Sequence, residues 1–265
     1  GVAAAGVTAA NATQTACAAG ASAGCDTAAG GDTRVGAAGG SFAMTLTAAL
    51  WTVDGDTDLS DNPVAPSFAG SVSLSATLAA PNGGSAGALG TSSATLAGGR
   101  ATVASQSWSQ SGALRIAASG SYFGNTVTGR SAVLGRFSPR GFTTAVTTQG
   151  CGAFTYSGQP MTAVRITALD GSSTPTATAN YVGAFVRTVT LSDAGGGSAG
   201  TFSAHTAGSA AFVGGVAVIA PVYTFTDPRT APLNLALRAT DGEASSAGIA
   251  EGSAAIRSGR LRIPN

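Results

Sequence analysis

Apolar and polar residues alternate with a period of two along most of this chain, a pattern that predicts β-strands. The clearest run is residues 71–78, Ser-Val-Ser-Leu-Ser-Ala-Thr-Leu, and residues 233–237 alternate in the same way. Such alternation puts the apolar side chains on one face of a strand. Helical periodicity is nearly absent, and the Ala-Gly-Ser mixtures between the runs are poor helix formers because each Gly costs about 1 kcal/mol in a helix. We therefore predict an all-β fold.

The strand pattern is present twice. Residues 90–103 read GTSSATLAGGRATV, and residues 200–213 read GTFSAHTAGSAAFV. The flanks are similar too, since residues 68–70 (Phe-Ala-Gly) match residues 181–183 (Tyr-Val-Gly). Each half holds about seven short strands separated by turn residues, which is the pattern of an antiparallel β-sandwich. The repeat predicts two tandem immunoglobulin-like β-sandwich domains.

Three segments are expected along the chain. Residues 1–40 are low in complexity and have little to bury, so they read as an extended segment. The alternating pattern starts at Ser41, and Pro139 suits a boundary because it cannot donate to a strand ladder. The two sandwiches are therefore expected at residues 41–136 and 137–265. Because the sequence stops within a strand-like run, we expect the second sandwich to be truncated and the chain to be a segment of a longer polypeptide.

Composition excludes several classes of protein. The net charge is +1, only 9% of residues are charged, and all 13 basic residues are Arg. This charge argues against nucleic acid as a partner, because phosphate recognition needs a basic stripe. No run reaches the roughly 18 apolar residues of a membrane helix, so no membrane span is expected in this segment. The 39 glycines follow no three-residue period, which excludes a collagen-like protein.

The chain has three cysteines. Cys17 and Cys25 lie in one Gly/Ala-rich segment and are close enough to close a small ring, so we predict a disulfide; two free thiols are the alternative. A metal site is not expected there, because no second Cys/His pair completes a tetrahedral set. Cys151 is either a buried thiol or the partner of a residue outside this segment. A disulfide would indicate an oxidising compartment.

The densest acidic run holds four of the chain's 12 acidic residues, Asp54, Asp56, Asp58 and Asp61. Aspartates at alternate positions are typical of the start of a calcium loop, where oxygen ligands converge on a hard cation. Leu59 stands where an EF-hand needs Gly, so the run is not an EF-hand. A looser calcium site is one interpretation, and a solvated acidic turn between strands is the other. Calcium is the one cofactor that the sequence suggests.

Catalytic patterns are poorly supported, and we expect no enzyme. The Gly-x-Ser-x-Gly pattern occurs at residues 20–24, 83–87 and 196–200, but none has the strand–turn–helix context of a nucleophile elbow. The single histidine, His205, aligns with Thr95 of the first copy, so we interpret it as an ordinary strand residue; a Ser-His-Asp site is the alternative. Paired carboxylates of a glycosidase would have to converge on one bond, which neighbouring turn residues seldom do.

Two further groups of residues have a structural and a binding interpretation. A charged group in the second half is interpreted as an ion-pair network, with a binding site as the alternative; it consists of Asp227, Arg229, Arg238, Asp241 and Glu243. Trp51 and Trp108 are interpreted as core residues of the first sandwich, with a platform for stacking sugars as the alternative. Neither group identifies a ligand.

Several motifs resemble a known bacterial family. They are Gly-Arg-Phe-Ser-Pro at residues 135–139, Cys-Gly-Ala-Phe-Thr-Tyr-Ser-Gly-Gln-Pro at residues 151–160, and Arg-Ser-Gly-Arg-Leu-Arg-Ile-Pro-Asn at residues 257–265, the last resembling the start of a longer motif. The chain resembles the MshQ-like proteins of mannose-sensitive haemagglutinin (MSHA) pilus biogenesis loci from about residue 42 onward, most specifically from residue 135. The resemblance implies a large exported surface or pilus-associated protein. It brings no catalytic or binding residues.

These observations favour a non-catalytic, extracellular structural or adhesive segment of a surface or pilus-associated protein. Exposed edge strands would allow such modules to self-assemble. The expected partners are other domains of the same polypeptide, copies of the chain, or a surface glycan. The alternative is a calcium-dependent or carbohydrate-binding adhesin module, and a hydrolase is a remote third.

Overall fold

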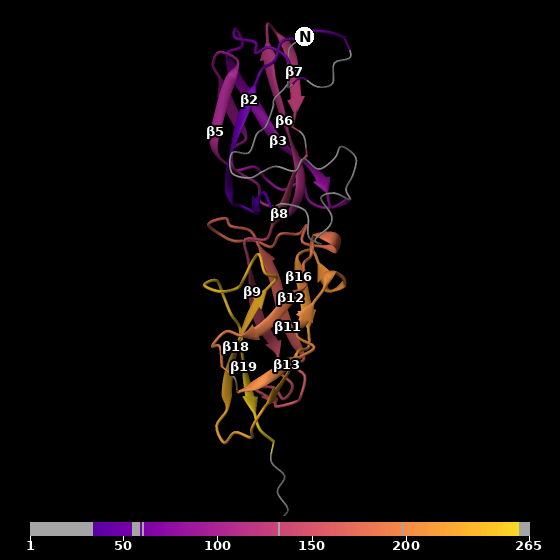
Figure 1. Cartoon of the computed structure of the whole chain (residues 1–265), viewed down its shortest axis with the longest axis vertical. Helices are drawn as coiled ribbons and strands as arrows, with labels where there is room; N and C mark the ends of the chain where they lie inside the picture. The colour runs from indigo at the N-terminus through magenta and orange to yellow at the C-terminus, as the bar shows by residue number, and fades with distance from the viewer. Residues whose placement is uncertain (1–33, 55–58, 60, 132, 198, 260–265) are drawn as a thin grey trace, which may run out of the picture. The chain divides into compact units, whose positions relative to one another are not determined.

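The computed structural model describes residues 34–54, 59, 61–131, 133–197 and 199–259. The chain divides into two compact units (Figure 1). The first unit comprises Gly1–Ser138 with Asp170–Pro175, and the second comprises Pro139–Leu169 with Thr176–Asn265. Among the described residues, no helix is both long enough and apolar enough to cross a bilayer.

The first unit packs two sheets against each other. The larger sheet has the order β1-β8-β6-β3-β4, with β7 paired to β6 as a hairpin, and the smaller sheet pairs β2 with β5. All pairs are antiparallel except β1 with β8, which run parallel. The strands are β1 (Gly36–Ala37), β2 (Ser41–Thr47), β3 (Gly70–Ala80), β4 (Ser93–Leu96), β5 (Arg100–Ser107), β6 (Gly112–Tyr122), β7 (Asn125–Arg130) and β8 (Leu134–Ser138).

The core of the first unit lies between these sheets and follows the alternation of the sequence. In β3 the apolar residues Val72 and Leu74 are buried, while the serines that alternate with them, Ser71, Ser73 and Ser75, are exposed. The central side chain is Trp108, which is fully buried and meets the Phe137 ring edge-on at 5.4 Å between centroids. Its indole Nε1 donates a hydrogen bond to the carbonyl oxygen of Ala86 at 2.7 Å. Trp108 is therefore a core residue, as interpreted from the sequence.

The second unit also has two main sheets. One has the order β10-β19-β18-β12-β14 and the other β15-β16-β11-β9, while β13 and β17 form a separate pair. Two short 3₁₀ turns, η1 (Gly183–Phe185) and η2 (Ser209–Ala211), connect strands. The strands are β9 (Gly141–Thr148), β10 (Thr155–Tyr156), β11 (Ala163–Leu169), β12 (Val189–Asp193), β13 (Gly200–Ser203), β14 (Thr206–Ala207), β15 (Phe212–Val213), β16 (Val216–Ile219), β17 (Val222–Phe225), β18 (Leu233–Thr240) and β19 (Ser253–Arg257).

The two units share one topology. The order β1-β8-β6-β3-β4 of the first corresponds to β10-β19-β18-β12-β14 of the second, and in each the outermost pair is parallel. The pair β2–β5 corresponds to β11–β16. In the second unit, the order β9-β11-β16-β15 opposite β12-β18-β19 is that of the ABED and CFG sheets of an immunoglobulin domain. The predicted all-β fold with two tandem immunoglobulin-like sandwiches is confirmed.

The repeated sequences fold alike only in part. The first copy, residues 90–103, covers β4 and the start of β5, whereas the second, residues 200–213, covers β13, β14, η2 and β15. β4 and β14 hold the same place at a sheet edge. His205 lies between β13 and β14, next to Ala204 with its positive φ of 49°, and not within a strand. The two copies therefore belong to corresponding parts of one topology, but their strands begin and end at different positions.

Candidate functional site

The most elaborate polar structure among the described residues is the loop of residues 241–252, which joins β18 to β19 in the second unit. Tyr181, only 1% exposed, donates its hydroxyl hydrogen to Asp241 Oδ2 at 2.7 Å. The other oxygen of Asp241 accepts the backbone N–H groups of Glu243 at 2.9 Å and Ala244 at 2.7 Å. Burial raises the pKa of the Tyr181 hydroxyl, and the Asp241 carboxylate beside it raises that pKa further. The start of the loop is therefore anchored to the core.

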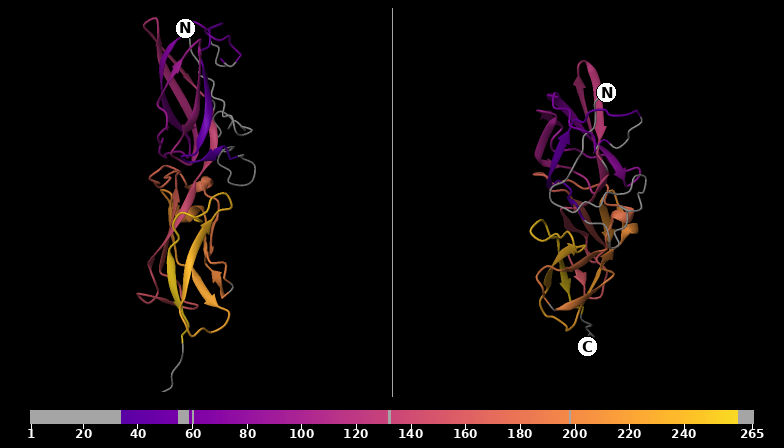
Figure 2. Two further views of the ribbon diagram at one scale, coloured as in Figure 1. Left: turned by 90° about the vertical axis from the view of Figure 1, so that its left-hand side faces the viewer. Right: turned by 45° about the horizontal axis from the view of Figure 1, so that its top comes forward.

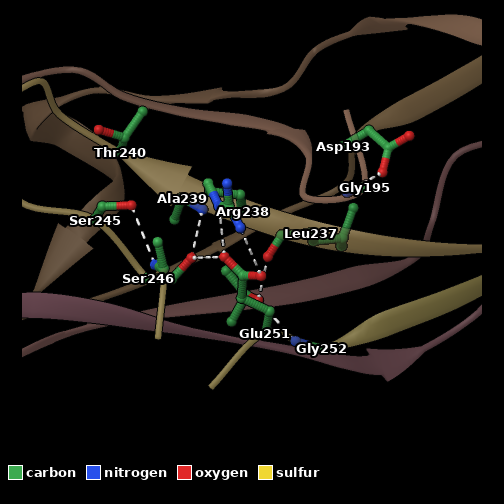
Figure 3. Close-up of polar contacts among 12 residues, drawn as sticks. Asp193, Gly195, Leu237, Arg238, Ala239, Thr240, Ser245, Ser246, Glu251 and Gly252 are labelled. Carbon is green, nitrogen blue, oxygen red and sulfur yellow. Dashed lines mark hydrogen bonds and ion pairs between the residues drawn. The ribbon is translucent and has the colours of Figure 1, made fainter. Parts of the chain in front are cut away.

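A second network holds the end of the same loop (Figure 3). The Arg238 guanidinium forms an ion pair with Glu251, with Nε at 2.8 Å from Oε1, and Ser246 donates its hydroxyl hydrogen to the same Oε1 at 3.0 Å. Ser246 Oγ also accepts the backbone N–H of Ala239 at 2.9 Å. The hydrogen bond from Arg238 lowers the pKa of the Glu251 carboxyl. These charges connect the loop to strand β18.

The predicted charged group of the second half is divided in the structure. Arg238 pairs with Glu251, and Glu243 pairs with Arg187 at 2.7 Å. Asp241 accepts hydrogen bonds from Tyr181 and the backbone. Arg229 belongs to the loop after β17, where its guanidinium lies 5.8 Å from the Phe225 ring centroid. The interpretation as ion pairs is right in kind, but the expected single cluster is wrong.

A polar cavity of about 290 Å³ lies beside this loop. Its lining combines one guanidinium, one carboxylate and two hydroxyl groups with small and aliphatic side chains: Arg140, Thr240, Gly242, Glu243, Ala244, Ser245, Ala247 and Ile249. The carboxylate of Glu243 is held by Arg187. This lining can form hydrogen bonds with a small polar group, but it contains no hydroxyl that is hydrogen-bonded to a side chain able to act as a general base. The arrangement is that of a braced loop, with no catalytic constellation in the cavity.

The residues of the predicted calcium site are only partly described. Asp54 and Asp61 are exposed, whereas Asp56 and Asp58 lie outside the described residues. Residues 48–50 pair antiparallel with residues 63–65 as an arm, in which Ala65 N–H donates to Ala48 O at 2.8 Å and Leu50 N–H donates to Pro63 O at 2.8 Å. Asp54 and Asp61 lie in the sequence between the two sides of this arm. Within the part of the chain that the structure describes, no group of three His, Cys, Asp or Glu residues could hold a metal. The calcium site and the solvated acidic turn therefore both stay as alternative interpretations.

The cysteine predictions have different outcomes. Cys17 and Cys25 lie outside the described residues, so their disulfide stays a prediction. Cys151 is a partly exposed free thiol, with Sγ at 3.4 Å from Gln159 Oε1. The same Gln159 oxygen accepts the backbone N–H of Tyr156 at 3.1 Å. Cys151 thus lies in a tight turn next to β10.

The other candidates for catalysis are in separate places. Ser85, of the pattern at residues 83–87, accepts the backbone N–H of Gly87 at 3.2 Å in a loop between β3 and β4. The serines of the other two patterns, Ser22 and Ser198, lie outside the described residues. The His205 ring packs against the Phe202 ring at 5.7 Å between centroids. No serine–histidine contact is found in the described residues.

The aromatic candidates separate into core and surface. Trp108 is fully buried, whereas Trp51, which follows the first side of the arm, is 50% exposed, so the interpretation as a core residue is right for Trp108 and wrong for Trp51. The most exposed large apolar residue described is Phe123, at 86%, in the turn of the β6–β7 hairpin. The sequence marks this turn through Gly124-Asn125, but nothing in the alternation distinguishes an exposed Phe123 from a strand residue. Trp51 and Phe123 are thus the surface aromatics of the first unit that merit a functional explanation.

Comparison with known proteins adds a family. Residues 5–109 match the second domain of DUF6701, and residues 110–256 match its third domain. The junction of these two matches precedes β6, whereas the compact units divide at Ser138, so strands β6 to β8 of the first sandwich fall in the third-domain match. No curated protein matches the chain.

One solved structure similar to the chain is the D0–D1 domain of intimin. The identity is 16%, and the match covers 84% of this chain and 93% of that one, with a TM-score of 0.23. This similarity is too weak to add to the fold already derived from strand order.

Proposed function

The chain belongs to the DUF6701 family, and we propose that it is a non-catalytic, load-bearing structural segment of a surface protein. The observation that carries the proposal is the parallel strand pair at the edge of each sandwich. In the first unit β1 runs parallel to β8, and in the second β10 runs parallel to β19. In the first unit the pair joins the first and last described strands, so tension along the chain acts on both of them. In the second unit β9 precedes β10, so tension reaches the β10–β19 pair once β9 has separated from β11.

The parallel direction determines how the pair resists tension. Pulling the start of one strand against the end of its parallel neighbour loads the interstrand hydrogen bonds together, in shear. An antiparallel hairpin pulled from its two adjacent ends loses its bonds one after another. In the first unit, Val35 N–H donates to Arg136 O at 2.8 Å and Ala38 N–H donates to Ser138 O at 2.7 Å. In the second, Ser157 N–H donates to Arg257 O at 2.8 Å.

Residues of each parallel pair are also buried in the core of their unit. Phe137 of β8 is 1% exposed and contacts both the Trp108 ring and the Phe42 ring, the latter at 5.6 Å between centroids. In the second unit, Thr155 of β10 and Ile256 of β19, which are register partners, are both fully buried. Separating either pair would therefore expose core residues as well as break hydrogen bonds.

Two of the motifs that resemble the MshQ-like family lie on these strands. Residues 135–139 include most of β8, all five residues of which are buried, and residues 151–160 contain β10 with its flanking turns. Motifs placed on the load-bearing strands support a mechanical role. The extracellular location and the association with a pilus belong to the proposal and rest on that resemblance alone.

The absence of catalysis is likewise part of the proposal. Its support is that the densest polar networks are used for structure: Asp241 caps a turn, and Glu251 holds Arg238 and Ser246. Such a role fits tandem modules with a net charge of +1, which repel neighbouring copies little.

Single-molecule force spectroscopy on the full chain tests the proposal. Val35→Pro removes the N–H that donates to Arg136 O, and Ser157→Pro removes the N–H that donates to Arg257 O. Ser157→Pro also removes the hydroxyl that accepts the N–H of Phe225, and Ser157→Ala, which loses that hydroxyl alone, is its control. We expect two unfolding events in the unmodified chain, with the first substitution weakening only the event of the first unit and the second only the other. Each variant thus serves as the control for the other. Unfolding forces that neither substitution changes would contradict the proposal.

A further inference from the structure

Exposed apolar side chains are concentrated at one end of the first unit. Of the eight large apolar residues that are exposed among the described residues, four lie there: Leu50 at 41%, Trp51 at 50%, Val53 at 61% and Phe123 at 86%. Aromatic residues are enriched in protein interfaces, and contiguous apolar patches on a soluble domain mark contact sites. We call this surface, together with Asp54 and Asp61, the loop end.

Strand register brings these residues to the same end. β6 ends at the hairpin turn of Phe123 beside the start of β3, since Val72 pairs with Gly120. The Tyr122 ring stacks on the Phe68 ring at 5.4 Å and meets the Phe123 ring at 4.4 Å between centroids. Phe68 in turn lies next to the arm, since its N–H donates to Ala65 O. Figure 2 shows the β6–β7 hairpin reaching beyond the rest of its sheet.

Phe123 is held in an unfavourable conformation there. Its φ is +48°, in the left-handed region that costs a residue with a side chain roughly 1–2 kcal/mol. With 86% of its surface exposed, the side chain gains little within its own unit. Phe123 and Gly124, with φ of +48° and +79°, are the two central residues of the hairpin turn, which requires such values, so it is the exposure of the aromatic ring that points to a contact with another molecule.

The loop end is acidic at its margin. Asp54 and Asp61 are both exposed, while exposed Arg100, the register partner of Thr47 at the same end, offsets one of these two negative charges. A partner for this surface should therefore combine an apolar or aromatic contact with positive charge.

The second unit presents such a surface where β19 ends. Tyr156 is 41% exposed and its ring meets the Phe154 ring edge-on at 5.0 Å between centroids. The Arg257 guanidinium lies 4.6 Å from the Phe154 ring centroid, and Arg257 is itself exposed. Exposed Arg229 lies close by, because its N–H donates to Ser258 Oγ at 2.9 Å. We call these four residues the tail end.

We propose that copies of this chain associate head to tail, the loop end of one copy docking on the tail end of the next. The proposal rests on the proposed structural function and names its partner. Trp51 and Phe123 would contact Phe154 and Tyr156, while Asp54 and Asp61 would face Arg229 and Arg257. Asp227 in the Arg229 loop reduces the positive charge without cancelling it.

The loop end and tail end are different surfaces, so the contact between copies is heterologous. Repeating it gives either a closed ring or an open filament, according to the rotation between successive copies. The charged part of this contact is exposed and should weaken as salt rises, because the Debye length falls from about 10 Å at 0.1 M to about 3 Å at 1 M. Its apolar part should not weaken with salt.

Sedimentation velocity on the full chain, over a range of protein and salt concentrations, tests the inference. We expect concentration-dependent association that decreases with salt. Phe123→Ser at the loop end and Arg257→Glu at the tail end should each raise the dissociation constant tenfold or more. Trp51→Ser and Arg229→Glu serve as second variants at each end. Val213→Ser, which removes an apolar residue that is 78% exposed but lies at neither end, should leave association unchanged.

Mixing the variants gives the decisive result. Phe123→Ser retains a tail end and Arg257→Glu retains a loop end, so an equimolar mixture should form pairs and nothing longer. A chain that stays monomeric at every concentration would overturn the inference, as would undiminished dimerisation of Arg257→Glu, the result expected for loop ends that pair with each other. Unfolding force is measured on single molecules, so the load-bearing function can stand when association fails, and the reverse.

Discussion

Replacing Tyr181 with Phe tests the polar anchor of the loop of residues 241–252. The substitution keeps the buried ring but removes the hydroxyl, which donates to Asp241 at 2.7 Å and accepts the backbone N–H of Arg187 at 3.3 Å. Hydrogen bonds to charged groups contribute about 1.5–3 kcal/mol. Asp241 keeps the N–H groups of Glu243 and Ala244 on its other oxygen, so we expect a loss of about 2 kcal/mol at pH 7, within that range.

The same substitution has a pH signature. Burial first, and then the charge of Asp241, raise the pKa of Tyr181 in the folded protein, whereas the unfolded chain has the ordinary value of about 10. The contribution of Tyr181 to stability is therefore complete below pH 10 and is lost as the pH rises, because only the unfolded chain releases the proton. At pH 11 this loss is about 1.4 kcal/mol. The difference between the unmodified chain and Tyr181→Phe should shrink from about 2 to about 0.6 kcal/mol between pH 7 and pH 11.

Chemical unfolding followed with two probes measures this difference. Both tryptophans, Trp51 and Trp108, lie in the first unit, so fluorescence reports that unit, whereas circular dichroism reports both. Tyr181→Phe should shift only the transition that fluorescence does not detect. Tyr156→Phe, at a tyrosine that is 41% exposed, is the matched control and should change neither. A difference that stays constant or grows between pH 7 and pH 11 would refute the reasoning.

Three further substitutions or conditions have expected outcomes. Trp108→Ala should destabilise the first unit by about 3–5 kcal/mol, because it removes a fully buried ring, and circular dichroism should show this loss while the second unit is unaffected. Glu251→Gln should lower the stability of the chain most near neutral pH. Arg238 lowers the pKa of Glu251, so the stabilisation from this ion pair is present above pH 4–5 and is lost as the pH falls. The stabilities of the unmodified chain and the variant should therefore converge in acid unfolding. We expect the same melting temperature with calcium and with chelator; a calcium-dependent rise that Asp54→Ala removes would establish the calcium alternative instead.

The sequence predicts the strands better than it predicts the pairs that bear load. Residues 71–78 alternate along a half-buried strand, and β3 buries Val72 and Leu74 as that pattern requires. β1 and β10 have two residues each, too few for a period to be visible. Their parallel partners, β8 and β19, lie about a hundred residues later in the chain. Such pairing depends on the whole topology, which local alternation does not encode.

The sequence predicts that the charged residues of the second half form ion pairs, but it does not predict which residue pairs with which. Arg238 was expected beside Asp241 and Glu243, its neighbours in sequence, but it pairs with Glu251. The reason is geometric: side chains alternate between the faces of β18, and the loop after it turns back to bring Glu251 alongside. The two tryptophans could not be told apart either, since burial of Trp108 and exposure of Trp51 depend on the path of the arm.

The most direct test of the load-bearing claim compares two substitutions in the first unit under two kinds of stress. Leu114→Ala removes a fully buried core side chain, which should lower chemical stability by about 2–5 kcal/mol. Val35→Pro removes one hydrogen bond beside β1, worth about 0.5–1.5 kcal/mol, at a partly buried position where the new side chain is no larger than the old one. If the parallel pair bears the load, Val35→Pro should lower the unfolding force more than Leu114→Ala, although it lowers chemical stability less. The same order of effects under force as under denaturant would contradict the account.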